Sequence, residues 1–429
     1  MSAKSWVTSA NELGDFPLAN LPYGSFEGES RPRRLGVRIG DEVVDLRALV
    51  ECGLLGGLDG RVSQALTQPT LNAFLALGPE AWRLTRARLT QLLRADCPEL
   101  RDHPKRGACL VPVWGLSMRL PCDIGDYTDF YASVHHATNV GTMFRPTNPL
   151  LPNWKHLPVG YHGRSSSLCA SPTQVRRPCG QTSATDEGPP VFGPTKLLDY
   201  ELEVGAIIGT GNPIGTRVTP SDAWRRIFGL VLVNDWSARD VQKWEYQPLG
   251  PFTAKNFVTT VSPWVVTMEA LRPYCEPVVA RPGGDPMPLP HLICPNDVAI
   301  PIQLEVTIAS EKMRQARQTP HLLSRGNFRD MYWSFAQMLA HHTSTGCAMQ
   351  PGDLIASGTV SGPAKDSRGC LLELTWRGTE PIDLPDGTQR RFLQDGDEVG
   401  MSGRLERAGL PRLGFGDCTG TVLPAHPAD

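Results

Sequence analysis

Two glutamates spaced two residues apart are the side chains of this chain best placed to do chemistry. Glu201 and Glu203 lie in the segment 198–208, whose alternating pattern predicts a strand with both carboxylates on one face. On a pleated strand they would stand roughly 7 Å apart. Like charges at this distance repel inside a folded domain. The face is therefore either open to water, as one side of an antiparallel sheet commonly is, or it holds a cation.

A third carboxylate follows an apolar run. Residues 230–233 predict a buried strand that a short helix from Thr219 precedes and that ends at Asp235. Ser237 is expected to cap a helix through residue 244, which carries Arg239 and Gln242 three positions apart. Asp235 is thus either a ligand or catalytic carboxylate at a strand end, or one half of a local ion pair with Arg239.

The densest group of reactive side chains lies at residues 125–145. Asp129 and Tyr131 share a face if this segment is extended, and His135 and His136 follow closely enough for one of them to act as a base. A loop with surface histidines is the alternative interpretation.

Several elements must position these groups. With 429 residues, 42 glycines and 39 prolines, the chain is long enough for two domains and is expected to consist of many short strands joined by tight turns. We predict a hairpin over 34–46 that turns at residues 40–41, a helix over 79–93, a strand over 108–113, a domain boundary near 118–121 and a helix over 328–342. The paired histidines that end this last helix, His341 and His342, are interpreted as structural. The glycines between 209 and 215 do not fit a dinucleotide-binding loop, because Pro213 stands where its helix should open.

Charge and cysteine content exclude some classes of function. The formal net charge is -2 and the isoelectric point is about 6.6, so we expect a small-molecule partner and no nucleic acid or acidic membrane. Eleven cysteines without a C-x-x-C pair are typical of reduced thiols in a cytoplasmic protein. The N-terminus lacks the apolar core of a signal peptide, and no apolar run approaches the roughly 20 residues that span a bilayer.

The chain resembles the fumarylacetoacetate hydrolase family over nearly its whole length. The segments that carry the resemblance include Asp129-Phe130-Tyr131, His136-Ala137-Thr138-Asn139-Val140-Gly141, Val159-Gly160-Tyr161-His162-Gly163-Arg164, Asn234-Asp235-Trp236-Ser237-Ala238-Arg239-Asp240, Lys255 with Thr259, Ser357-Gly358-Thr359 and Asp395-Gly396-Asp397-Glu398-Val399. The resemblance implies a mainly β protein, with a small SH3-like barrel domain over residues 1–120 and a larger mixed β-roll catalytic domain over 121–429. It also implies a homodimer.

The resemblance further implies hydrolysis of the carbon–carbon bond of 4-fumarylacetoacetate to fumarate and acetoacetate, the last step of tyrosine and phenylalanine (homogentisate) degradation. The positions that match the family's metal region, which would hold Mg²⁺ or Ca²⁺, are Asp129, Glu201, Glu203, Asp235, Lys255 and Thr259. Catalytic positions are His136 as base, Glu373 as its orienting partner, and Arg239, Gln242 and Lys255 as stabilisers of an oxyanion. Substrate-binding positions are Tyr131, Arg145, Tyr161, Gln242, Tyr246 and Thr359.

Some assignments stay open at this level. The choice of His136 over His135 follows from its register with Ala137-Thr138-Asn139. Loops 182–190 and 277–290 match nothing in the family pattern, so the rim of the site and the dimer contacts have no assigned residues. A related metal-dependent acylpyruvate or other β-diketone hydrolase or decarboxylase is the main alternative function. A non-catalytic binding module and a purely structural Ca²⁺ site are the others.

Overall fold

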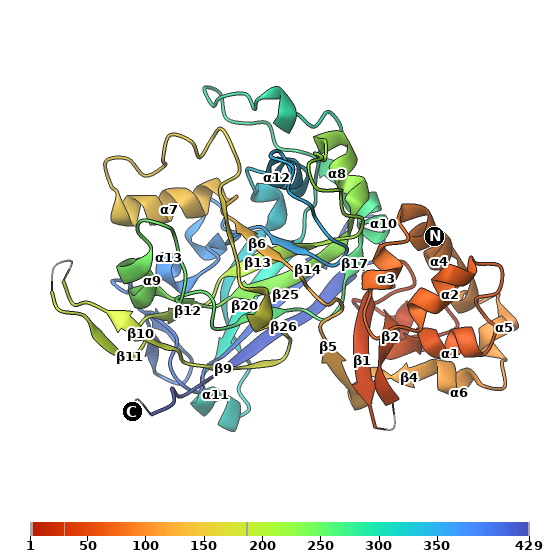
Figure 1. Ribbon diagram of the computed structural model, residues 1–429. Coiled ribbons are helices and arrows are strands. Elements are labelled where there is room, and N and C mark those ends of the chain that lie inside the picture. The colour runs from red at the N-terminus through yellow and green to blue at the C-terminus, as the bar shows by residue number, and fades with distance from the viewer. Residues whose placement is uncertain (1–2, 30, 186–187, 428–429) are drawn as a thin grey trace.

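The computed structural model describes residues 3–29, 31–185 and 188–427. The fold is mainly β, as predicted, with the N-terminal part of the chain gathered on one side of the molecule (Figure 1). The expectations that fall on residues 1–2, and on 186–187 within the loop 182–190, lie outside the described residues.

The helices and strands have the following bounds. The α-helices are α1 (Leu46–Glu51), α2 (Gly60–Leu66), α3 (Asn72–Leu75), α4 (Pro79–Leu93), α5 (Pro98–Arg101), α6 (Arg106–Cys109), α7 (Val134–Phe144), α8 (Pro220–Arg226), α9 (Arg239–Glu245), α10 (Met268–Leu271), α11 (Glu311–Gln315), α12 (Phe335–His342) and α13 (Leu371–Leu374). The strands are β1 (Tyr23–Gly28), β2 (Arg31–Ile39), β3 (Glu42–Asp45), β4 (Leu110–Pro112), β5 (Leu116–Arg119), β6 (Tyr127–Phe130), β7 (Gly160–His162), β8 (Leu168–Ala170), β9 (Thr173–Arg176), β10 (Cys179–Thr182), β11 (Val191–Pro194), β12 (Leu198–Asp199), β13 (Leu202–Ile208), β14 (Ile227–Asp235), β15 (Ser237–Ala238), β16 (Thr259–Val261), β17 (Val266–Thr267), β18 (Glu276–Pro277), β19 (Val298–Ala299), β20 (Gln303–Ala309), β21 (His321–Asn327), β22 (Leu354–Ala356), β23 (Ile382–Asp383), β24 (Gln389–Arg390), β25 (Glu398–Leu405) and β26 (Leu413–Leu423).

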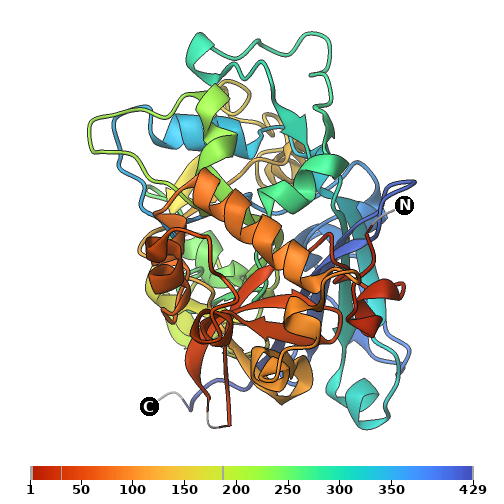
Figure 2. The same cartoon turned by 90° about the vertical axis from the view of Figure 1, so that its right-hand side faces the viewer.

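The N-terminal part is built on an antiparallel sheet with the order β4-β3-β2-β1-β5. The predicted hairpin is present, because β2 and β3 pair through Ile39 and Glu42 around a turn in which Gly40 has a φ of +52°. The predicted helix over 79–93 is α4, which begins at Pro79, where proline lacks only an amide that a first turn leaves unpaired. Helices α1 to α6 accompany this sheet, and α4 crosses it in the side view (Figure 2).

The site is positioned by a central sheet with the order β7-β6-β22-β13-β14-β16-β8. Strand β14 lies deep inside it, and every residue of this strand is buried. Leu230 and Leu232 face a core shared with the second large sheet, β21-β20-β25-β26-β9, whereas Val231 and Val233 face the core of the N-terminal part. Both faces of the strand are therefore covered by protein, which is why its sequence is a continuous apolar run.

Two expectations about the strand and helix near the site were wrong. The strand expected over 198–208 is interrupted at residues 200–201, because β12 pairs with β15 while β13 pairs with β14. Ser237 lies in β15, donates a hydrogen bond to the Asp235 carbonyl oxygen at 3.0 Å, and does not cap α9, which begins at Arg239.

Two further elements differ from their predicted bounds. The helix expected over 328–342 is divided, and α12 begins only at Phe335, where Ser334 at the N-cap and Gln337 in the first turn form a capping box. The backbone before α12 makes a contact outside the helix, since the amide of Tyr332 donates to the carbonyl of Ala132 at 3.0 Å. The strand expected over 108–113 starts later, at Leu110, because residues 106–109 form the short helix α6.

The structure contains neither a disulfide nor a membrane-spanning helix among its described residues. All eleven cysteines are free. Within residues 3–29, 31–185 and 188–427, no helix has the length and apolar character needed to cross a membrane.

Gly358 is a point of close backbone approach beside the site. Its φ is +74°, and a Cβ atom there would lie 2.2 Å from the carbonyl oxygen of Phe130 in β6. Gly53 has a similar φ of +71° but no atom within 4 Å of the position of a Cβ.

We therefore expect Gly358→Ala to lower the free energy of unfolding by at least about 3 kcal/mol, because positive φ and backbone overlap act together. Gly53→Ala should lower the free energy of unfolding by only about 1 kcal/mol, because at this position the positive φ acts without backbone overlap. Urea unfolding of both variants measures the difference, and equal losses would contradict the role of backbone crowding at Gly358.

Candidate active site

Four carboxylates meet at the centre of the main sheet. Asp129 comes from β6, Glu203 from β13, Asp235 from the end of β14, and Glu201 from the break before β13. One oxygen of each lies within 4.8 Å of the others, and all four side chains are buried. The interpretation of Glu201 and Glu203 as a solvated face is therefore wrong.

Two buried cations lie against this carboxylate cluster. The Lys255 ammonium donates to Glu201 and, at 2.6 Å, to Asp235, while Arg239 Nη1 lies 2.7 Å from Glu201 Oε1. Burial alone would raise the pKa of Glu201, but Lys255 and Arg239 hold it at about 2. Burial would lower the pKa of Lys255, but the contacts with Asp235 and Glu201 raise it. Arg239 pairs with Glu201 and Asp199, so a local pair with Asp235 does not account for its position.

The other two carboxylates lack this compensation. Burial and the neighbouring acids raise the pKa of Glu203 and of Asp129 well above the usual range. Neither oxygen of Glu203 has a hydrogen-bond partner among the described residues. A buried carboxylate without a partner is costly. Four carboxylates that offer hard oxygen ligands, one of them without any hydrogen-bond partner among the described residues, fit a divalent cation such as Mg²⁺ or Ca²⁺. Such a cation would offset both the lost hydration of the carboxylates and the repulsion between them.

Two hydroxyls complete the surroundings of Asp235. Tyr161 donates to its Oδ2 at 2.9 Å from β7, and Thr259 donates to its Oδ1 at 3.1 Å from β16. Thr259 thus lies in the region predicted for it. Tyr161, predicted as a substrate contact, is bonded to the carboxylate cluster while also lining the cavity described below.

A buried histidine–glutamate pair faces this cluster. Ser133 caps α7 by accepting from the amide of His136, so the segment of the adjacent histidines is helical and the surface-loop alternative is wrong. His136 Nδ1 lies 2.6 Å from Glu373 Oε2, which comes from α13, and His136 is only 4% exposed. Burial would raise the pKa of Glu373, but His136 and hydrogen bonds from Asn139 and Ser361 hold it at about 2. Of the two histidines, the structure brings His136 and not His135 to Glu373.

A cavity of about 440 Å³ joins these groups, a size typical of small-ligand sites. All predicted substrate-binding residues line it, namely Tyr131, Arg145, Tyr161, Gln242, Tyr246 and Thr359. His136 lines it too, as do Asp129 and Glu201 of the carboxylate cluster and the two cations Arg239 and Lys255. Three lining residues carry buried polar atoms with no partner among the described residues, namely Arg145 Nε, Arg239 Nη2 and Thr359 Oγ1. Such unpaired donors suit an anionic, oxygen-rich ligand.

Some contributing residues received no role from the sequence. Asn139 donates to Glu373 Oε1 at 2.8 Å, and its position three residues after His136 on a helix was a usable signal. Ser361 donates to Glu373 Oε2 at 2.8 Å, and Asp199 bonds Arg239. For Ser361 and Asp199 no local pattern points to the partner, because the two contacts join residues 12 and 40 positions apart, beyond the spacing of one helix or strand.

Comparisons with known families and proteins agree along the chain. Residues 126–423 match the family model described as fumarylacetoacetate (FAA) hydrolase C-terminal, and residues 19–121 match fumarylacetoacetase N-terminal. The curated fumarylacetoacetase of Bos taurus is 50% identical over 417 residues, 96% of this chain and 97% of the relative. The Caenorhabditis elegans fumarylacetoacetase is 50% identical over 428 residues, 98% and 99% of the two chains.

Solved structures show the same fold at greater distance. The fumarylacetoacetate hydrolase of psychrophilic Exiguobacterium antarcticum has a TM-score of 0.52 and 18% identity, and the match covers 95% of this chain and 100% of that one.

Glu203→Gln separates cation binding from folding. The neutral amide removes a repelling charge, so the chelated variant should be at least as stable as chelated wild type, while its Mg²⁺ affinity should fall at least about tenfold. At equal saturating Mg²⁺ this removes about 1.4 kcal/mol of metal-dependent stabilisation, measured by thermal unfolding with and without the ion.

Asp353→Asn is the matched control. Asp353 is a buried acid outside the cluster, where it accepts backbone amides. Its replacement should lower stability and leave the Mg²⁺-dependent shift intact. An unchanged Mg²⁺ shift in Glu203→Gln would show that this carboxylate does not bind the ion.

Proposed function

The chain belongs to the fumarylacetoacetate hydrolase family, and we propose that it hydrolyses the carbon–carbon bond of 4-fumarylacetoacetate to fumarate and acetoacetate. The observation that carries this proposal is one cavity lined both by His136, which is paired with the buried Glu373, and by members of the carboxylate cluster with their two cations. Full-length identity of about 50% to curated fumarylacetoacetases supports the same substrate.

His136 is assigned as the general base. Its Nδ1 is held by the ionised Glu373, which sets the tautomer and leaves Nε2 as the acceptor for a proton from water. The hydroxide so formed attacks a ketone carbonyl of the diketone, whose oxygen becomes an oxyanion. Arg239, Gln242 and Lys255 line the same cavity and are assigned to stabilise that charge.

The bond to the departing carbon then breaks, and its electron pair leaves as the enolate of acetoacetate, which takes up a proton. Asp129, Glu201, Glu203 and Asp235 would hold a Mg²⁺ or Ca²⁺ ion, with Lys255 and Thr259 beside it. Such an ion would supply Lewis-acid stabilisation of the negative charge on the diketone oxygens.

The remaining cavity residues are assigned to substrate binding. Arg145 supplies a cation, and Tyr131, Tyr161, Tyr246 and Thr359 supply hydroxyls. The substrate is a diacid, so a guanidinium with an unpaired Nε fits one of its carboxylates.

We also propose a metabolic role, a cellular location, an oligomeric state and a domain boundary for this protein. Fumarate and acetoacetate are the expected end products of tyrosine and phenylalanine degradation. Eleven free thiols favour a cytoplasmic protein, and the family resemblance favours a homodimer. The boundary between the two domains is proposed at residues 120–121, next to the ends of the two family matches.

Turnover of fumarylacetoacetate by the Mg²⁺-loaded protein tests the function directly. His136→Ala should lower kcat at least about 10²-fold by removing the base, whereas His135→Ala should change it little. Glu373→Gln should fall between the two, because the imidazole loses its orienting partner but remains. Loss of activity in His135→Ala alone would reverse the assignment, and an inactive wild type would refute the function.

Arg145 tests the choice of substrate. In Arg145→Ala, kcat/KM for fumarylacetoacetate should fall about 10- to 100-fold, the value of a charge-assisted bond at a partly buried site. Arg145→Lys should recover only part, since an ammonium cannot bind a carboxylate through two parallel bonds. An analogue lacking one terminal carboxylate should lose much less in Arg145→Ala. A wild type that prefers this analogue would favour the related β-diketone hydrolase instead.

A further inference from the structure

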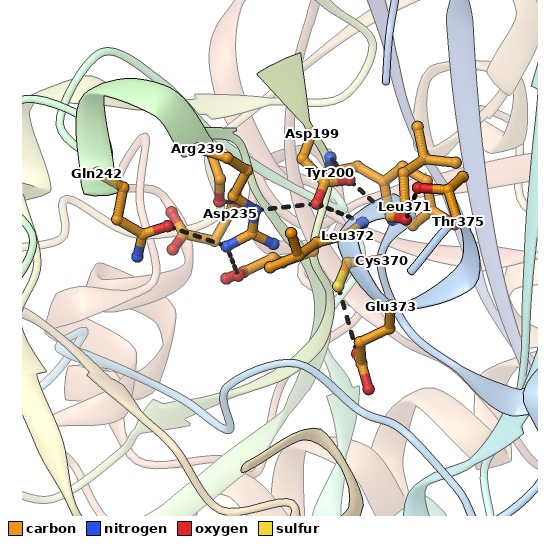
Figure 3. Close-up of polar contacts among 12 residues, drawn as sticks. Asp199, Tyr200, Asp235, Arg239, Gln242, Cys370, Leu371, Leu372, Glu373 and Thr375 are labelled. Atoms are coloured by element: carbon orange, nitrogen blue, oxygen red, sulfur yellow. Dashed lines mark hydrogen bonds and ion pairs between the residues drawn. The ribbon is translucent and has the colours of Figure 1, made fainter. Parts of the chain in front are cut away.

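Asp199 is a buried carboxylate to which the reaction above assigns no role. Its side chain is 0% exposed, and its two oxygens accept four hydrogen bonds. Oδ2 accepts from Arg239 Nε at 2.9 Å and from the Leu372 amide at 3.0 Å. Oδ1 accepts from the Leu371 amide at 2.8 Å and from the Tyr200 amide at 2.9 Å. Figure 3 shows Asp199 between the guanidinium on one side and the start of α13 on the other.

One of these four contacts helps to fix the Arg239 guanidinium. Nε is bound by Asp199, and Nη1 is bound by Glu201 at 2.7 Å and by the Gln242 Oε1 atom at 3.1 Å. Because a guanidinium is planar, two anchored nitrogens determine the direction of the third. That third nitrogen, Nη2, has no partner among the described residues and belongs to a residue that lines the cavity. Asp199 thus determines which N–H group Arg239 presents.

Two other contacts, from the Leu371 and Leu372 amides, fix the start of α13. This helix has only four residues, and the side chain of Cys370, at its N-cap position, makes no capping hydrogen bond. Asp199 accepts the first two amides instead, which a helix start otherwise leaves unpaired. Glu373 is the third residue of this helix and holds His136 Nδ1 at 2.6 Å. The position of the base therefore depends on a helix anchored by Asp199.

We propose that Asp199 is a positioning residue that holds the oxyanion donor Arg239 and the Glu373–His136 pair in one fixed geometry. Through it, the group that stabilises the developing charge and the group that activates water act on the same carbonyl. This role rests on the function proposed above. A buried ion pair of purely structural importance is the competing explanation, because removal of one partner from any buried pair is costly.

Asp199→Asn tests the role, since it keeps the shape and one acceptor oxygen but removes the charge that holds Arg239. We expect kcat for fumarylacetoacetate to fall at least about tenfold while KM changes less than about threefold, as for an interaction made in the transition state. The matched control is Asp397→Asn. Asp397 is 1% exposed and binds Arg390 through two bonds of 2.7 and 2.8 Å, away from the cavity. The Asp397→Asn substitution should lower Tm by a similar amount and leave kcat unchanged.

A double-mutant cycle with Arg239→Gln separates positioning from general destabilisation. Because Arg239→Gln already removes one of the two groups that Asp199 holds, Asp199→Asn should lower kcat by a smaller factor in the Arg239→Gln background than in the wild type. Full multiplication of the two losses, or a kcat in Asp199→Asn no lower than in Asp397→Asn, would overturn the proposal. If Asp199→Asn does not fold, the kcat of Arg239→Lys tests the role in its place, because lysine keeps the charge but cannot make both anchoring contacts. A wild-type kcat in Arg239→Lys would overturn the role.

A crystal structure of Asp199→Asn gives a readout that needs no substrate. The Arg239 guanidinium and the start of α13 should both be displaced, whereas Asp397→Asn should leave them in place. Inactivity of the wild type toward fumarylacetoacetate would refute the proposed function alone. Unmoved Arg239 and α13 in the Asp199→Asn crystal would refute the positioning role alone.

Discussion

The rest of the site depends on the burial of several carboxylates in one small volume. Asp129, Glu201, Glu203 and Asp235 lie together out of contact with bulk water, where like charges repel strongly and each lost hydration shell must be replaced. Lys255 and Arg239 compensate part of this charge, and they do so at Glu201 and Asp235. The raised pKa values of Asp129 and Glu203 mark the part that remains uncompensated. A cation bound there would convert a destabilising arrangement into a stabilising one.

These charges are connected to the base by a continuous set of polar contacts. Glu201 binds Arg239, Arg239 binds Asp199, and Asp199 binds the start of α13. Helix α13 in turn carries Glu373 to His136. Every member of this set is buried and has a defined partner, so loss of one leaves another charge or amide without compensation. The same contacts that make the site costly to build also restrict it to one geometry.

The scaffold can hold such a site because its strands are covered on both sides. The core of the N-terminal part packs on one face of β14, and the second large sheet packs on the other. Asp235 therefore stands at the end of a strand with little freedom to move, beside Glu203 on β13 and near Asp129 on β6. The N-terminal part thus contributes to the site by covering the sheet that carries the carboxylates, although none of its described residues borders the cavity.

Local signals in the sequence were sufficient for the hairpin at Gly40 and for the helix that begins at Pro79, because the residues that define those elements are neighbours in the chain. They also showed where the reactive side chains are, and the family resemblance grouped them into sets that the structure brings to one cavity. Tertiary structure alone decided the break at residues 200–201, which lets the chain pass between two sheets, and the burial of Glu203. It alone brought Glu373 to His136, 237 residues away, and Asp199 to both Arg239 and α13. Spacing along a chain predicts contacts within one strand or helix, whereas these contacts form between elements whose relative positions are set only when the cores on both sides of the central sheet are packed.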